Sequence, residues 1–280
     1  MIWSTDVSDT SAARSVQGRL QLRFALERGR TVLACCERTA PFHLQRLLYL
    51  EAHYPALARA TVLNGTAGLF AGDRLELAVE VGAGAAASLT TPTMTRVFGM
   101  REGHARVRTR LTVAAGGYLE YLPEPTLLCR AAALHQRTAL DLEPGARAAL
   151  GEVFAFGRRA HGERHAYRSL DQQQEIHVAG DLVLCERLHL TPDRSPDAVG
   201  MLGDYAAYGS LQLLNPGGDS ERLLAATRTV LAGDPHLYAA ASLLSNGQGV
   251  VVRALGEAPS AVQRVLTSLV HAFRRRTCPR

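Results

Sequence analysis

The sequence predicts a mainly β protein built of stacked mixed sheets, solenoid-like in arrangement, with two α-helices near the C-terminus. Three observations predict this class: apolar and polar residues alternate over most of the chain, a strand–turn pattern recurs about every 30 residues, and helical periodicity appears only near the end. We expect the 280 residues to form one domain, with a β-rich body at 18–215 and a helix-containing portion at 216–280.

Alternation with a period of two marks the strands of the body. Residues 19–26, 73–81, 104–113 and 181–190 each place apolar side chains on one face and mostly polar side chains on the other. This pattern is typical of half-buried strands, because successive side chains of a strand point to opposite faces.

A weak internal repeat supports the solenoid-like arrangement. Residues 79–84, 111–116 and 140–145 share the order apolar, polar, apolar, two spacers and glycine, each followed by a further strand candidate. Stacked coils of about 30 residues would produce such a repeat. A β-rich chain can also produce it by coincidence, and the pattern alone leaves both interpretations open.

Two helices are predicted in the C-terminal portion. Residues 220–232 follow a capping Asp219 and end at Gly233. Residues 259–275 begin with Pro259 in the first turn and carry apolar residues at helical spacing. We expect the apolar face of the second helix to pack on the sheet of its own chain, with binding of a partner as the alternative.

The charge of the chain does not indicate a nucleic-acid-binding surface. The net charge is +5, and all 31 basic residues are arginine. These arginines are scattered and aromatic residues are few, so we expect no nucleic-acid partner. The one dense cluster, 274–276, lies at the end of a predicted helix, where cations complement the helix dipole.

No membrane span or secretory signal is expected. No apolar run approaches the ~20 residues that cross a bilayer, and the first residues are polar and acidic. The five cysteines show neither metal-binding nor disulfide spacing. These features favour the cytoplasm as the location.

Catalytic signatures are absent from the sequence. The nucleophile elbow, the phosphate-binding loop, the zinc-protease motif and the dinucleotide fingerprint are all missing, so we do not expect an enzyme. One enzymatic alternative remains open. Glu120 and Glu124 could act as an acid–base pair on a polysaccharide, as in some β-rich hydrolases.

One short segment carries potential metal ligands at alternate positions: His161, Glu163 and His165. If the segment is extended, all three side chains project to one face and could hold nickel, zinc or copper. The alternative, which we favour, is a solvated strand face.

Several acidic residues lie among apolar or small residues: Asp73, Glu120, Glu152 and Glu186. A buried carboxylate is costly unless it is paired or bound to a metal. Pairing with nearby Arg158 or Arg187 is one explanation, and a wet internal path for a cation is the other.

Several short motifs follow one another in a fixed order along the body of the chain. The motifs are residues 30–31 (RT), 40–49 (APFHLQRLLY), 68–73 (GLFAGD), 89–98 (LTTPTMTRVF), 119–125 (LEYLPEP), 157–163 (GRRAHGE) and 186–188 (ERL). Their order and spacing over about residues 18–190 resemble the UreD/UreH family of urease accessory proteins, whose patterns include GGLVxGD, LTTxxxTKxY, LEWLPxP and GRxxxGE. Ala67, Arg96 and Tyr121 replace the usual glycine, lysine and tryptophan.

The resemblance implies a cytoplasmic scaffold rather than an enzyme. Members of the family bind UreF, which recruits the GTPase UreG, and the assembly docks on the urease apoprotein and supports nickel delivery. The resemblance also implies a stack of β-sheets with a helical C-terminal portion, and a dimer within the complex with UreF.

The resemblance further implies an internal tunnel for nickel. By motif position its wall residues are Asp73, Thr95, Glu152 and Glu186. Glu120 and Arg158 lie in two further motifs and are candidate binding residues. No tightly bound cofactor is expected, because a cation in transit needs oxygen ligands and water that release it again. The alternative is a pure adaptor that links UreF and UreG to urease while nickel never enters it.

Overall fold

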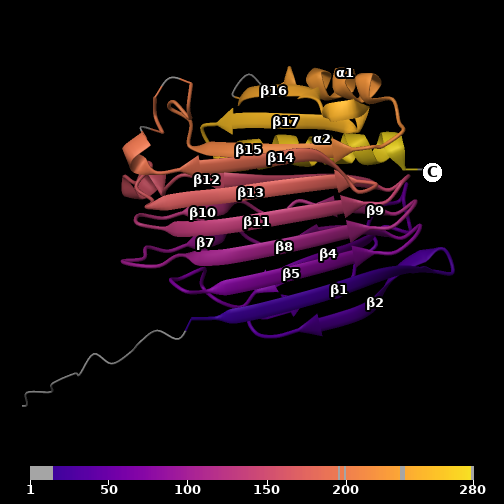
Figure 1. Ribbon diagram of the computed structural model, residues 1–280, viewed down its shortest axis with the longest axis horizontal. Coiled ribbons are helices and arrows are strands. Elements are labelled where there is room, and N and C mark those ends of the chain that lie inside the picture. The colour runs from indigo at the N-terminus through magenta and orange to yellow at the C-terminus, as the bar shows by residue number, and fades with distance from the viewer. Residues whose placement is uncertain (1–14, 195, 199, 234–236, 279–280) are drawn as a thin grey trace, which may run out of the picture.

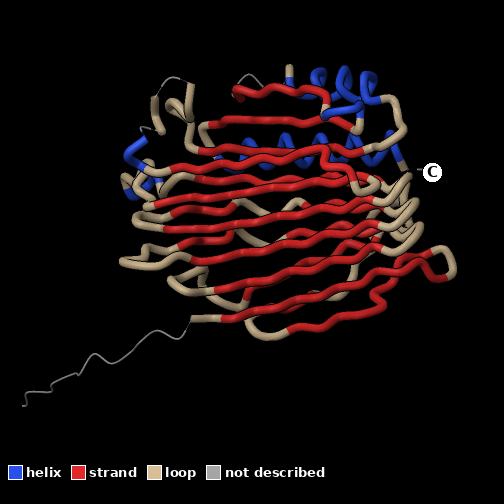
Figure 2. Tube along the Cα trace, viewed as in Figure 1, coloured by secondary structure: helices blue, strands red, loops and turns tan. Residues whose placement is uncertain are grey.

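The computed structural model describes residues 15–194, 196–198, 200–233 and 237–278. Two β-sheets stack face to face, and two α-helices cover the outer side of one of them (Figure 1, Figure 2). We call the uncovered sheet, which faces the viewer in Figure 1, the front sheet, and the helix-covered sheet the rear sheet.

The front sheet has seven strands, of which the five inner ones run parallel and the two edge strands are antiparallel to their neighbours. Their order is β14 (Asp181–Leu190), β13 (Ser169–Val178), β11 (Ala133–Leu142), β8 (Ala105–Val113), β5 (Arg74–Val81), β1 (Gln17–Glu27) and β2 (Arg30–Arg38).

The rear sheet has ten strands. Its main order is β16 (Leu237–Leu243), β17 (Gly249–Gly256), β15 (Ala207–Leu214), β12 (Arg147–Ala155), β9 (Tyr118–Tyr121), β6 (Ala86–Thr90), β4 (Ala58–Asn64) and β3 (Phe42–Leu44). Two short strands, β7 (Thr95–Val97) and β10 (Thr126–Leu128), pair with each other, and β10 also pairs with β12. The parallel strands β4, β6, β9 and β12 belong to the coils, whereas β15, β17 and β16 add in antiparallel order.

From β4 to β13 the chain passes back and forth between the sheets, with β5, β8, β11 and β13 in the front sheet and β4, β6, β9 and β12 in the rear sheet, so this part winds as a solenoid. The register confirms the repeat seen in the sequence: Val79 lies beside Leu111 and Leu111 beside Leu140 on β5, β8 and β11. The three turn glycines all adopt the left-handed conformation: Gly84, Gly116 and Gly145, with φ of 67°, 68° and 75°. Glycine adopts this conformation without a steric penalty, so the turns stack in register.

Both predicted helices are present behind the rear sheet. Helix α1 (Ser220–Leu231) is capped by Asp219, whose side chain accepts a hydrogen bond from the backbone N–H of Arg222 at 2.9 Å. Helix α2 (Pro259–Thr277) buries an apolar face that includes Val262 and Phe273 against the rear sheet. The expected packing on the chain's own sheet is therefore confirmed, since this face is covered.

One arginine of the 274–276 cluster differs from expectation. Arg275 and Arg276 are exposed at the end of α2, as predicted, but Arg274 is buried and turns toward the rear sheet. Its partner there is a buried carboxylate, described below, and this ion pair explains the inward orientation.

The remaining described segments are loops and three single-turn 3₁₀ helices at Arg159–His161, Pro192–Arg194 and Ser245–Gly247. Within the part of the chain that the structure describes, neither α-helix is apolar enough over a sufficient length to cross a lipid bilayer. The core lies in two layers, one between the sheets and one between the rear sheet and the helices.

Candidate functional site: a polar layer between the sheets

The space between the sheets is mostly apolar, but polar side chains cross it at one level. On the front sheet Thr109, Thr138, Gln174 and Glu186 lie side by side on β8, β11, β13 and β14. On the rear sheet Glu152, Ser210 and Arg253 lie side by side on β12, β15 and β17. With their polar neighbours they form what we call the polar layer: Thr109, Tyr121, Gln136, Thr138, Glu152, Gln172, Gln174, Glu186, Tyr208, Ser210, Gln212 and Arg253.

Glu152 lies at the centre of the polar layer and is buried. Its Oε2 accepts a hydrogen bond from Gln136 Nε2 at 2.7 Å, and its Oε1 accepts one from Gln172 Nε2. Burial and the negative charge of Glu186 raise the pKa of Glu152 to about 8, although Arg253 opposes this. The carboxyl group therefore holds a proton at neutral pH.

Glu186 has the opposite environment, because a guanidinium binds it directly. Arg253 Nε donates to Glu186 Oε1 at 2.8 Å, and the Arg253 Nη2 group binds Oε2. The Tyr208 hydroxyl also donates to Oε1, at 3.1 Å. This two-pronged geometry is the strong form of an arginine–carboxylate pair.

A cavity of about 110 Å³ adjoins Glu152 between the sheets. Its polar wall includes Thr95, Thr109, Glu124, Gln136 and Glu152. The cavity has room for several water molecules. A surface hollow of about 420 Å³ shares the wall residues Asn64, Thr91 and Thr95 with it, so the hollow and the cavity are adjacent. We call this threonine-rich surface hollow the vestibule.

A second surface hollow lies at the other end of the polar layer. This groove of about 290 Å³ is lined by Tyr208 and Arg253 together with Tyr238 and apolar residues. Two buried oxygens of the layer, Gln174 Oε1 and Gln212 Oε1, have no hydrogen-bond partner among the described residues. Because a buried acceptor without a partner is costly, water or a cation is the expected partner of these oxygens.

The structure brings together three of the four residues expected to line a tunnel. Thr95 and Glu152 line the same cavity, and Glu186 belongs to the same polar layer. Asp73 is buried but does not line the cavity. Its two carboxylate oxygens accept hydrogen bonds from the backbone N–H groups of Val16 and Phe70, at 2.7 and 2.8 Å, and so close the turn before β5. A role for Asp73 in transit stays a prediction.

The segment that carries His161, Glu163 and His165 is not extended, which the metal-binding interpretation had assumed. The solvated strand face that we favoured is also wrong, because Glu163 and His165 are buried. His161 ends a 3₁₀ helix and Gly162 is left-handed, so the three side chains do not share a face. His165 packs against Phe156 and Tyr167. Over the described ranges, no three His, Cys, Asp or Glu side chains are grouped to hold a metal ion.

Arg158 and Glu163 form an ion pair that closes this loop. Arg158 Nη2 lies 2.6 Å from Glu163 Oε1, and its Nε donates to Oε2 at 3.0 Å. This contact holds the pKa of Glu163 at about 2. A Cβ on Gly157, which has a φ of 108°, would lie 2.7 Å from the Glu163 carbonyl oxygen. The GRxxxGE motif therefore has a structural basis in this loop.

Glu120 is the buried partner of Arg274. Arg274 Nε and Nη2 donate to its two oxygens at 2.6 and 2.9 Å, and the Tyr118 hydroxyl donates at 2.7 Å. Glu120 thus lies under helix α2, whereas Glu124 lines the cavity between the sheets. The structure does not bring the two carboxyl groups together as an acid–base pair.

The sequence did not identify Arg253, Tyr208 or the glutamines of the polar layer. A signal was present, since Ser210 and Gln212 interrupt the apolar run of β15. Recognising it requires the pairing of β12, β15 and β17, which joins segments far apart in the chain.

Comparison with known proteins finds a family model and relatives that are all described as urease accessory proteins. A family model described as "UreD urease accessory protein" matches residues 16–280. The chain is 36% identical to "Urease accessory protein UreD" of Haloarcula marismortui, over 89% of this chain and 83% of that protein. It is 33% identical to the protein of the same name from Yersinia enterocolitica serotype O:8, over 88% and 78%.

A further relative, "Urease accessory protein UreD 2" of Streptomyces griseus, is 31% identical over 96% of this chain and 94% of its own length. The family match covers both sheets and both helices, including every residue of the polar layer. The chain therefore belongs to the UreD family of urease accessory proteins.

Proposed function

We propose that this chain is a non-catalytic, cytoplasmic scaffold of urease maturation that passes nickel through its polar layer. In this proposal it binds UreF, which recruits UreG, forms a dimer within that complex, and docks on the urease apoprotein. The observation that supports a path is the adjacency of vestibule, cavity and polar layer: Thr95 lines both the vestibule and the cavity, Glu152 lines the cavity, and Glu186 belongs to the same polar layer as Glu152.

The chemistry of the layer suits a divalent cation in transit. Its side chains offer carboxylate, amide and hydroxyl oxygens, which bind nickel more weakly than clustered thiolates or imidazoles would. Glu152 holds a proton at neutral pH, so a cation that binds there must displace that proton. The affinity of such a ligand for the cation therefore depends on pH, and binding of the cation releases a proton.

The proposal is tested by removing each carboxylate without changing its shape. In cells with all other urease genes, Glu152→Gln and Glu186→Gln should each lower the nickel content and activity of urease several-fold. The matched control is Glu175→Gln, which neutralises a carboxylate on the outward-facing side of β13. A pull-down with UreF should recover each variant in equal amounts.

The outcomes separate the two candidate roles. Full nickel loading of urease in both layer variants, with the complex intact, would contradict transit and favour the pure adaptor. Nickel-replete urease in cells that lack the chain altogether would contradict the maturation role itself.

A further inference from the structure

Arg253 lies where the polar layer meets the groove. Strand β17 places it at the same level as Ser210 and Glu152 on the rear sheet. Its side chain is 32% exposed and lines the groove beside Tyr208 and Tyr238. Its guanidinium points across to the front sheet, where it binds Glu186. One side chain therefore joins the two sheets at the open end of the layer.

The surroundings of Glu186 are those of a cation site. Both carboxylate oxygens bind the guanidinium, and the Tyr208 hydroxyl lies 3.1 Å from one of them. Gln174 is the neighbour of Glu186 across β13 and β14, and its buried Oε1 has no partner among the described residues. A second such oxygen is Gln212 Oε1 on β15, whose Nε2 donates to Ser210 at 2.7 Å, and Ser210 in turn lies beside Arg253. These neutral and anionic oxygens are ligands that a divalent cation accepts.

We infer that the Glu186 carboxylate is a divalent-cation site that the guanidinium of Arg253 occupies at rest, so that Arg253 closes the polar layer. A cation can bind only when the guanidinium leaves Glu186 and turns into the groove, which has room for it. This inference rests on the proposed function, because it concerns the same path, and it adds the residue that controls one end of it.

The physical basis is competition between two cations for one anion. A guanidinium and a divalent ion cannot share the two oxygens of Glu186, since their charges repel and their contacts overlap. The apparent affinity of the site for a cation is therefore its intrinsic affinity reduced by the fraction of molecules in which Arg253 has turned away. Removing the guanidinium should raise the apparent affinity by the inverse of that fraction.

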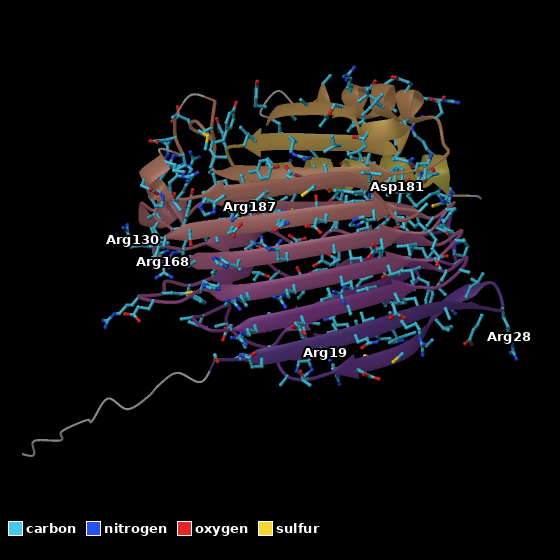
Figure 3. All side chains as sticks on the ribbon, in the orientation of Figure 1. Arg19, Arg28, Arg130, Arg168, Asp181 and Arg187 are labelled. Carbon is cyan, nitrogen blue, oxygen red and sulfur yellow. The ribbon has the colours of Figure 1, made fainter. Side chains whose placement is uncertain are left out.

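The test measures binding of nickel chloride to the purified full-length chain by equilibrium dialysis. Arg253→Met keeps the length of the side chain and removes its charge, and should bind nickel at least about tenfold more tightly than the wild type. Adding Glu186→Gln to that variant should abolish the gain. The matched control is Arg187→Met. Arg187 lies on the outer side of β14 (Figure 3), and its guanidinium binds Asp171 in the same two-pronged way.

Two further variants keep the test decisive. If Arg253→Met does not fold, Arg253→Gln replaces it, because its amide still donates a hydrogen bond to Glu186 and the carboxylate keeps a partner. Arg253→Lys retains the charge and should keep nickel affinity close to that of the wild type. Folded Met or Gln variants that bind nickel no better than the wild type would overturn the inference. That result is distinct from failure of nickel transit, which is read from urease in cells.

Discussion

The buried guanidinium group of Arg274 connects helix α2 to the rear sheet. Its guanidinium contacts Glu120 on β9 and also Glu51, and its side chain is only 6% exposed. An ion pair of this kind contributes little net stability when complete, but it is costly when half of it is removed. The helix and the sheet thus depend on each other through one residue of an otherwise exposed arginine cluster.

Arg274→Met should destabilise the protein by about 3–5 kcal/mol, because Glu120 would remain buried without a counter-ion. The neighbouring Arg275 is exposed, so Arg275→Met should change the free energy of unfolding by no more than about 0.5 kcal/mol. Urea denaturation measures both. Equal effects would contradict the assigned contact, and Arg274→Met/Glu120→Gln should recover part of the loss.

Glu152 makes stability depend on pH in a defined direction. The unfolded carboxyl loses its proton near 4.5, and the folded one keeps it until about 8. Between these values the folded state holds more protons, so stability falls as pH rises. Glu152→Gln removes this dependence. The free energy of unfolding of this variant, measured relative to that of the wild type, should therefore be higher at pH 9 than at pH 5 by on the order of 3 kcal/mol.

Thermal unfolding at the two pH values checks this expectation. Glu76→Gln serves as the control, because Glu76 lies exposed on the outer face of β5 and its replacement should not change the difference between pH 5 and pH 9. If Glu152→Gln lost as much stability between pH 5 and pH 9 as the wild type does, the raised pKa would belong to a different group.

At the scale of elements, strands and helices that follow from a local pattern can be predicted from the sequence, whereas the pairing of distant strands cannot. The strands at 74–81 and 105–113, the repeat that joins them, and both helices are visible in the sequence because each follows from spacing within a few residues. The pairing of β12 with β15 and of β15 with β17 is not local, and it is this pairing that brings Arg253 to Glu186. The resemblance to the family supplied Thr95, Glu152 and Glu186, whereas it gave no signal for Arg253.

The solenoid turns depend on glycines with positive φ. At Gly116, φ is 68° and a Cβ would meet no atom closer than 3.9 Å. The cost of Gly116→Ala is therefore conformational rather than steric, and should be about 1–2 kcal/mol. Gly233 has no positive φ among the described backbone angles, and Gly233→Ala should be neutral within about 0.5 kcal/mol. Denaturant titration compares the two, and equal values would contradict the strain argument.

At the scale of the whole molecule, the two ends of the stack differ. Strand β2, an edge strand of the front sheet, carries arginines and glutamate. Strand β16, an edge strand of the rear sheet at the opposite end of the stack, reads Leu-Tyr-Ala-Ala-Ala-Ser-Leu without a charge. Charged side chains prevent edge strands from pairing with other chains. The β16 edge therefore lacks this protection, and the exposed Tyr238 adds apolar surface beside it.

Ser242→Lys should reduce self-association of the isolated chain, because Ser242 is exposed on the β16 edge and a lysine there opposes strand pairing. Thr229→Lys places the same charge on an exposed position of α1 and serves as the control. Sedimentation velocity over a range of concentrations checks this. Equal self-association of both variants and the wild type would contradict the role of the edge.

The polar layer runs along the stack, so its residues follow the order of the chain. Synthesis proceeds from the N-terminus, and folding generally begins there. The cavity wall around Thr95 is therefore made first, then Glu152 and then Glu186, and Arg253 follows Glu186 by 67 residues. A nascent chain that has completed β14 carries the carboxylate without its guanidinium. The proposed site is thus open while the protein is being made, and the last strand, β17, closes it.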